Sequence, residues 1–277
     1  MGAPLKGERL SKRVVITGST RGIGNGLARE FLKRGCSVAI SGRSTDAVAT
    51  TVAELGGHYG EAKVCGIACD ITDPAALQRL WDCAAEAFGG ADVWINNAGI
   101  SIERKPLWEQ SDEALDGLVT TNLTGAIFGS KVAIRNMLAQ GGGQVWSTEG
   151  FGSDGATQTG MVAYGSTKRA VRYMQKGLRK DTADTPVQIC TVSPGIVVTD
   201  LLTSDYDLTS EQWEKSKKIF NILGDEVHTV TPWLVEHILA TDKSGVRVAW
   251  LTRRKAFGRF MTAAFNRRDL FAGVEKP

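Results

Sequence analysis

The chain has 277 residues and a formal net charge of +3. This length fits one large α/β domain with a sizeable core, and the small charge excludes a strongly basic nucleic-acid-binding protein. The 5 cysteines and 3 histidines show no metal-ligand spacing, so we expect no metal site and core thiols in a reducing compartment. No apolar run has the length of a membrane span, and residues 1–12 lack the features of a secretory signal or a transit peptide.

Apolar runs of strand length alternate with helical patterns along the chain. Such alternation predicts a Rossmann-type α/β fold, a doubly wound parallel sheet of about seven strands with helices on both faces. We expect a single domain over 1–277, in which residues 201–230 break the alternation. The expected strands are 14–17, 37–41, 63–68, 93–96, 143–147, 188–192 and 246–251.

A glycine-rich turn follows the first expected strand, and a helical pattern runs from Asn25 to Arg34. Between a strand and a helix, glycines let the backbone approach a pyrophosphate, whose charge the helix N-terminus stabilises. The spacing is Gly-x-x-x-Gly-x-Gly, and the alternative is a tight turn that binds no ligand. The turn consists of Gly18, Ser19, Thr20, Arg21, Gly22, Ile23 and Gly24.

Tyr164 and Lys168 lie one turn apart on an expected helix, so both side chains lie on the same face. A phenol has a pKa of about 10, and a nearby ammonium lowers that pKa by favouring the phenolate. The pair is therefore suited to donate a proton during carbonyl reduction. Alone, the pair is a weak signal, because many surface helices carry it by chance.

Three further segments follow in the order found in short-chain dehydrogenases/reductases. They are the turn Asn96-Asn97-Ala98-Gly99 after a strand, Asn122 within an expected helix over 113–138, and the loop Ser193 to Thr199. Together with the glycine turn and the tyrosine–lysine pair, they make residues 12–200 resemble this family.

The resemblance implies a role for each of these residues. Tyr164 donates a proton to the carbonyl oxygen as hydride arrives from a nicotinamide, Lys168 holds the nicotinamide ribose, and Asn122 supports a water that relays protons to Lys168. The resemblance also implies that residues 201–230 form a substrate lid, and the alternative is an ordinary surface helix pair. It further implies that the chain forms a homo-oligomer. Outside the glycine turn, the implied cofactor contacts are Asn97, Ala98, Gly99, Tyr164, Lys168, Pro194, Gly195, Val197 and Thr199.

The end of the second strand predicts which nicotinamide cofactor binds. NAD enzymes commonly carry a carboxylate there, which accepts from the ribose hydroxyls. Here Arg43 and Ser44 take its place, with Arg21 in the glycine turn, and a guanidinium is suited to a phosphate. We therefore expect NADPH, with Arg43 and Arg21 at the 2′-phosphate, and the alternative is two solvated arginines. By resemblance, Asp70 and Ile71 flank the adenine.

The sequence departs from the family after the fifth strand, where two adjacent serines are usual. The expected serine falls near Gly150 and Phe151. The hydroxyl that contacts the carbonyl oxygen must then come from Ser153 or Ser147. We favour Ser153, because it lies past the strand end, and the alternative for either serine is a simple turn residue.

The run Glu149-Gly150-Phe151-Gly152-Ser153 resembles a narrower group, the chlorophyll b reductases, as do residues 193–202 and 220–223. This resemblance spans 18–260 and implies NADPH-dependent reduction of the C7 formyl group of chlorophyll b or chlorophyllide b, a formyl tetrapyrrole, to the 7-hydroxymethyl product. The alternatives are a reductase of a smaller ketone or aldehyde and, from another class, an NADPH-binding sensor without turnover. The expected location is the cytoplasm for a bacterial relative, or the plastid for a mature plant form.

Residues 252–277 form a tail in which basic and apolar side chains interleave at roughly helical spacing. Such a segment can lie on an anionic membrane surface, and peripheral membrane contact would suit a lipid-soluble pigment. An oligomer contact and a solvated helix are the alternatives.

Overall fold

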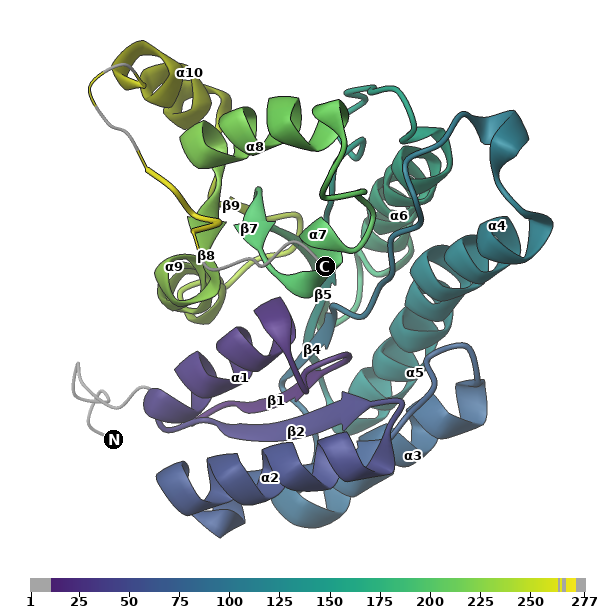
Figure 1. Cartoon of the computed structure of the whole chain (residues 1–277). Helices are drawn as coiled ribbons and strands as arrows, with labels where there is room; N and C mark the ends of the chain where they lie inside the picture. The colour runs from purple at the N-terminus through teal and green to yellow at the C-terminus, as the bar shows by residue number, and fades with distance from the viewer. Residues whose placement is uncertain (1–10, 264, 266–267, 273–277) are drawn as a thin grey trace.

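The computed structural model describes residues 11–263, 265 and 268–272, and it contains a central parallel sheet with helices on both faces (Figure 1). The strand order is β3-β2-β1-β4-β5-β6-β9, with every pair parallel. The predicted Rossmann-type sheet is therefore confirmed. The strands are β1 Arg13–Ile16, β2 Ser37–Gly42, β3 Val64–Ala68, β4 Val93–Asn96, β5 Gly143–Thr148, β6 Val187–Ser193 and β9 Arg247–Ala249.

Two helical layers cover the sheet, because alternate residues of a strand point to opposite faces. Val14 and Ile16 of β1 pack into one core with Phe31, whereas Val15 packs into the other core with Leu80. The first layer is α1 Gly22–Lys33, α2 Thr45–Tyr59 and α9 Val227–Leu239; the second is α3 Pro74–Phe88, α5 Gly125–Gln140 and α6 Val162–Asp181.

The helix expected over 113–138 is interrupted by a π turn. It consists of α4 Asp112–Val119, the π turn Thr120–Thr124 and α5. Single π turns are rare and are frequently found at functional sites. Here the turn contains Asn122, whose side chain is buried.

The segment that breaks the alternation forms two helices next to a small sheet. These helices, α7 Asp200–Thr203 and α8 Glu211–Leu223, with the residues between them, are the helical cover. In the small sheet, β7 Val197–Val198 pairs with β8 Asp225–Glu226. Residues 227–230 already belong to α9, and Val230 is fully buried in the main core. The sequence pattern did not predict the two-stranded sheet, because its strands have only two residues each.

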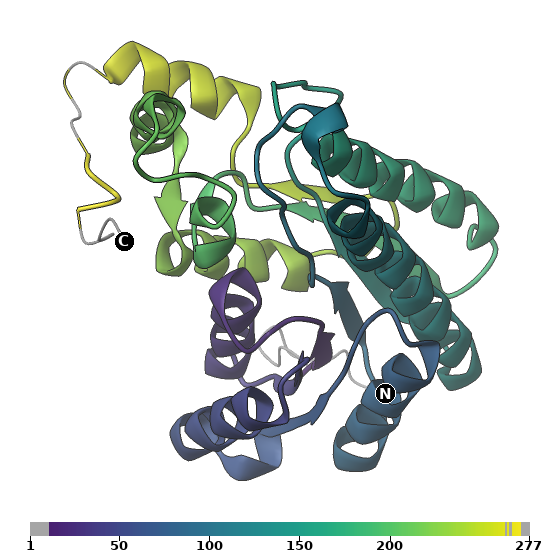
Figure 2. The same cartoon turned by 45° about the vertical axis from the view of Figure 1, so that its right-hand side comes forward.

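The end of the described chain packs back onto this cover. After α10 Arg253–Thr262, Phe271 enters a cluster with Trp213 and Phe220 of α8. The ring centres of Trp213 and Phe271 lie 5.1 Å apart, edge to face, an arrangement that aromatic pairs prefer. Figures 1 and 2 both show α10 beside α8 at one end of the molecule. Among the described residues, no helix combines the length and hydropathy that crossing a bilayer requires.

Replacing Phe271 by alanine should lower the free energy of unfolding by about 3 kcal/mol, because it leaves a cavity among buried rings. Phe271 is only 3% exposed. The matched change Phe257→Ala, at a ring that is 69% exposed, should cost less than about 0.5 kcal/mol. Urea unfolding of both variants measures the difference, and equal losses would contradict the packing described for the chain end.

Candidate active site

The glycine turn has the backbone conformation that the sequence predicts for a phosphate-binding turn. Gly18 and Gly22 have φ angles of +63° and +56°, which residues with a side chain rarely adopt. A Cβ on Gly24 would overlap the Gly18 carbonyl, so the first turn of α1 packs directly on the end of β1. At its glycines the turn therefore presents backbone without side chains next to the N-terminus of α1. The N-terminus of a helix stabilises an anion.

The other expected cofactor segments follow the carboxyl ends of β2, β3, β4 and β6. The Asn97 amide donates to the carbonyls of Thr17 and Gly18, at 3.0 and 3.1 Å, and so ties the turn after β4 to the glycine turn. A Cβ on Gly22 would lie 3.6 Å from Thr199, so the loop after β6 faces the same place. Parallel strand topology thus gathers at one edge segments that are far apart in sequence.

The two arginines of the expected 2′-phosphate site differ in their contacts. Arg43 is exposed, and among the described residues its side chain has no recorded hydrogen bond or ion pair. Arg21 is also exposed and forms a long ion pair of 3.4 Å with Asp200. The Ser44 hydroxyl accepts from the Ala47 amide and caps α2.

Some of the expected cofactor residues have structural contacts of their own. Ser19 is fully buried, and its hydroxyl donates to the Ile16 carbonyl and accepts from the Ser41 amide. Ile71 is buried against Gly125 of α5, whereas Asp70 is exposed and accepts from Thr72. The side chains of Ser19 and Ile71 therefore serve mainly to hold the turns that carry them.

Asn122 and Lys168 converge on Gly99. A Cβ on Gly99 would lie 3.0 Å from Asn122 Oδ1 and 3.5 Å from Lys168 Nζ. Asn122 is held in place by the Ile100 backbone, since Oδ1 accepts from its amide at 2.8 Å and Nδ2 donates to its carbonyl at 2.9 Å. The Lys168 ammonium lies 5.6 Å from the centre of the Tyr164 ring. The structure thus brings together the three polar residues that the family motifs select.

Burial dominates the protonation of the tyrosine and the lysine. It raises the pKa of Tyr164 to about 12, with a further increase from the Asp205 carboxylate and an opposing effect of Arg104. Burial also lowers the pKa of Lys168 to about 8. The expectation that Lys168 lowers the Tyr164 pKa is therefore not met in the protein alone, because desolvation disfavours both charged forms. At neutral pH the phenol carries its proton, as a proton donor requires.

The residue beside the phenol is Gly150 rather than a serine. A Cβ on Gly150 would lie 2.6 Å from Tyr164 Oη. Ser153 is 3% exposed, and its hydroxyl donates to Glu149 Oε2 at 3.4 Å; the Ser147 hydroxyl is buried and accepts from Gln175 at 2.6 Å. Both serines thus have partners away from the phenol, so a serine contact to the substrate stays a prediction that these hydrogen bonds do not favour.

Sequence reasoning missed Glu149 as an anchor of this turn. Glu149 is 3% exposed, and its carboxylate pairs with Arg247 of β9 at 2.7 Å. The Ser153 carbonyl accepts from Arg169 and Arg172 of α6. The turn after β5 is therefore fixed to the sheet at one end and to α6 at the other.

A second missed pair is Arg104 and Asp205. These side chains are 7% and 3% exposed, and they form an ion pair of 3.1 Å between the loop after β4 and the segment after α7. Asp205 Oδ2 also accepts from Ser101 at 2.9 Å, while Oδ1 is buried and has no hydrogen-bond partner among the described residues. The pair ties the helical cover to the body close enough to Tyr164 to affect its pKa. No local pattern could reveal it, because the two residues lie 101 positions apart.

The model of the family described as short chain dehydrogenase matches residues 12–208. The chain belongs to the short chain dehydrogenase family. This confirms the sequence resemblance, and it makes the chain an oxidoreductase. Within the described residues, no three His, Cys, Asp or Glu side chains gather as a metal site would require.

Curated relatives of this short chain dehydrogenase include two rice proteins (Oryza sativa subsp. japonica). Chlorophyll(ide) b reductase NOL is 40% identical over 265 residues, which cover 92% of this chain and 76% of that protein. Probable chlorophyll(ide) b reductase NYC1 is 36% identical over 276 residues, which cover 94% of this chain but only 54% of that protein. This chain therefore spans about half of NYC1. Both rice proteins are named as chloroplastic.

Among solved structures, a short chain dehydrogenase from Burkholderia cenocepacia J2315 in complex with NADP is 26% identical, with a TM-score of 0.74. The similarity covers 87% of this chain and 97% of that one. The family's sheet and its helical layers are therefore shared over most of this dehydrogenase.

Replacing Gly150 by alanine should reduce the kcat of this dehydrogenase by about 100-fold, because the new methyl group displaces Tyr164 and a shift of about 1 Å can cost that much. The control is Gly177→Ala on α6, where a Cβ would meet nothing within 4 Å. Steady-state kinetics of the two variants decide the matter. A Gly150→Ala enzyme with the kcat of the control would show that this close approach does not position the phenol.

Proposed function

We propose that the chain is an NADPH-dependent reductase of the C7 formyl group of chlorophyll b or chlorophyllide b, producing 7-hydroxymethyl chlorophyll(ide) a. The observation that carries this proposal is the 40% identity to a protein named chlorophyll(ide) b reductase over 92% of the chain. The gathering of Asn122, Tyr164 and Lys168 at the carboxyl edge of the sheet supports it chemically.

The residues around the glycine turn fit a dinucleotide. The bare turn from Gly18 to Gly24 would receive the pyrophosphate, and the loops after β4 and β6 would hold the nicotinamide end. Arg43 would bind the 2′-phosphate, since its side chain is exposed and Arg43 and Ser44, rather than a carboxylate, directly follow β2. When bound, NADPH supplies the hydride.

Side chains of this chain would supply the proton that the carbonyl oxygen receives. Tyr164 holds its proton at neutral pH because burial raises its pKa, so it can donate to the developing alkoxide. Lys168, whose pKa lies at about 8, would place a positive charge near the phenol. It would then return a proton to Tyr164 after the tyrosine has donated its own. Asn122 would support a water molecule that passes protons to Lys168.

The proposal includes a homo-oligomer and a location. A groove of about 470 Å³ between α5 and α6 is lined by the exposed Ile127 and Leu138 and the half-buried Ile134, and an apolar groove of this kind supports contact with a second copy. The plant relatives are named as chloroplastic, so a plastid is proposed for a mature plant form and the cytoplasm for a bacterial one.

Replacing Tyr164 by phenylalanine should lower kcat for chlorophyllide b by at least about 100-fold, because the general acid is lost. NADPH affinity should stay close to that of the wild type, since the ring remains. Pigment absorbance follows turnover, and NADPH fluorescence follows binding. Undiminished turnover in this variant would overturn the assigned proton donor. If neither protein reduced the pigment while both bound NADPH, the substrate assignment would fail.

Replacing Arg43 by alanine should weaken NADPH binding on the order of ten-fold or more, because a charge-assisted hydrogen bond to phosphate is lost. NADH lacks the 2′-phosphate, so its dissociation constant serves as the internal control and should change little. Titrations with the two cofactors measure both values. Equal weakening of NADPH and NADH would remove Arg43 from the 2′-phosphate site.

A further inference from the structure

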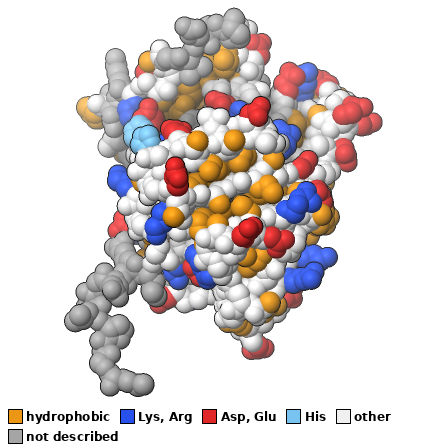
Figure 3. Space-filling model, turned by 90° about the horizontal axis from the view of Figure 1, so that it is seen from below, with side chains coloured by type: hydrophobic (Ala, Val, Ile, Leu, Met, Phe, Trp, Pro, Cys, Tyr) orange, Lys and Arg blue, Asp and Glu red, His pale blue; other side chains and the backbone are white. Residues whose placement is uncertain are grey.

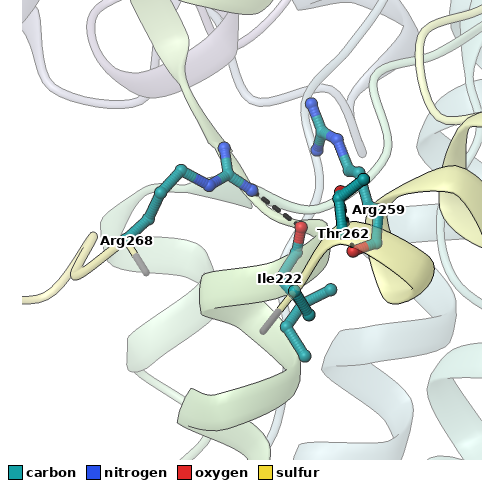
Figure 4. Close-up of a pocket in the computed structure, with 5 residues that line it drawn as sticks. Ile222, Arg259, Thr262 and Arg268 are labelled. Atoms are coloured by element: carbon teal, nitrogen blue, oxygen red, sulfur yellow. Dashed lines mark hydrogen bonds between the residues drawn. The ribbon is translucent and has the colours of Figure 1, made fainter. Parts of the chain in front are cut away.

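Helix α10 is attached to the protein by its basic side. Arg259 donates to the Leu223 carbonyl at 2.7 Å and pairs with Asp225 at 2.8 Å, while the Lys255 ammonium lies 3.0 Å from the centre of the Trp250 ring. Beyond the helix, Arg268 donates to the Ile222 carbonyl at 2.7 Å. Figure 4 shows Arg259 and Arg268 at the end of α8, around a small cavity. These arginines satisfy the free carbonyls at the C-terminus of α8.

The apolar side of α10 faces away from the protein. Phe257, Phe260 and Met261 are 69%, 50% and 66% exposed, and Phe265 is 92% exposed. Positions 257, 260 and 261 are three and four residues apart, so they share one face of the helix. Surface helices of globular proteins normally have the opposite arrangement, with the apolar face towards the core.

The charged side chains of α10 itself have a single sign. Arg253 and Arg254 are exposed at the start of α10, and no acidic residue occurs between 250 and 268. The end of the molecule opposite α10 is different, because there hydrophobic side chains lie among both basic and acidic ones (Figure 3). A helix with an apolar face and with only basic charged side chains is typical of helices that lie on anionic membranes.

We propose that the exposed face of α10, with Phe257, Phe260, Met261 and Phe265, docks on the surface of a bilayer that contains anionic lipids. The rings and the thioether enter the boundary between headgroups and acyl chains, and Arg253 and Arg254 contact the lipid phosphates. Because α10 packs beside α8 of the cover, a pigment dissolved in that bilayer would reach the site from this side. Only this last consequence rests on the proposed function.

Co-sedimentation of the full chain with phosphatidylcholine vesicles, with and without phosphatidylglycerol, tests the docking without pigment or cofactor. We expect binding to the anionic vesicles that weakens as salt is added. The triple variant Phe257→Ser, Phe260→Ser and Met261→Ser should bind at least about ten-fold more weakly. Removing both charges with Arg253→Gln and Arg254→Gln should cost about five-fold for each residue. The control Trp108→Ser, at a ring 84% exposed outside α10, should bind like the wild type.

Wild-type protein that stays in solution with anionic vesicles would overturn the inference, as would equal binding by the triple serine variant. Light scattering adds a third decisive result. A wild-type dimer that becomes monomeric in the triple variant would show that a second copy covers this face instead. Vesicle binding by a chain that reduces no pigment would support the docking and overturn the proposed function, so the two failures are distinguishable.

Discussion

The close approach of two backbones positions the Tyr164 phenol, and the rest of the candidate site depends on it. The turn after β5 lies against the first turns of α6, where a Cβ on Gly152 would come within 2.5 Å of the Gly165 Cα atom. Glu149 anchors this turn to β9 through Arg247, and Gly150 leaves the space that Tyr164 Oη occupies. Both glycines are thus packing requirements, since a side chain at Gly150 would move the phenol and one at Gly152 would push the turn away from α6.

Close backbone packing also determines the shape of the glycine turn. Gly24 allows α1 to begin directly above β1, and Gly18 passes close to Ala98 of the neighbouring turn. Parallel strands then bring the turns after β1, β4 and β6 to one edge, where helix N-termini favour an anion. The proposed catalytic side chains and the expected cofactor contacts therefore come together through one topology, and the Arg104–Asp205 pair ties the helical cover to the body beside them.

The sequence predicted the sheet well because each strand is a short apolar run between helical patterns, and parallel topology then determines which turns meet. It could not predict the π turn at Asn122, since α4 and α5 continue the same helical pattern. It also missed Glu149–Arg247 and Arg104–Asp205, which join residues about a hundred positions apart. The position of Ser153 past the strand end favours it as the substrate contact, whereas its hydroxyl in the structure donates to Glu149, a partner that the sequence pattern does not indicate. The sign of the Tyr164 pKa shift depends on burial, which only the structure gives.

Transfer of deuterium tests the central claim most directly. The chain is incubated with chlorophyllide b and NADPH that carries deuterium in both hydrogen positions at C4 of the nicotinamide ring, and the pigment is analysed by mass spectrometry. Direct hydride transfer to the formyl carbon predicts a 7-hydroxymethyl product that carries one deuterium at that carbon, formed by the wild type and not by Tyr164→Phe. A pigment that remains unreduced, or a product that contains no deuterium, would contradict the account.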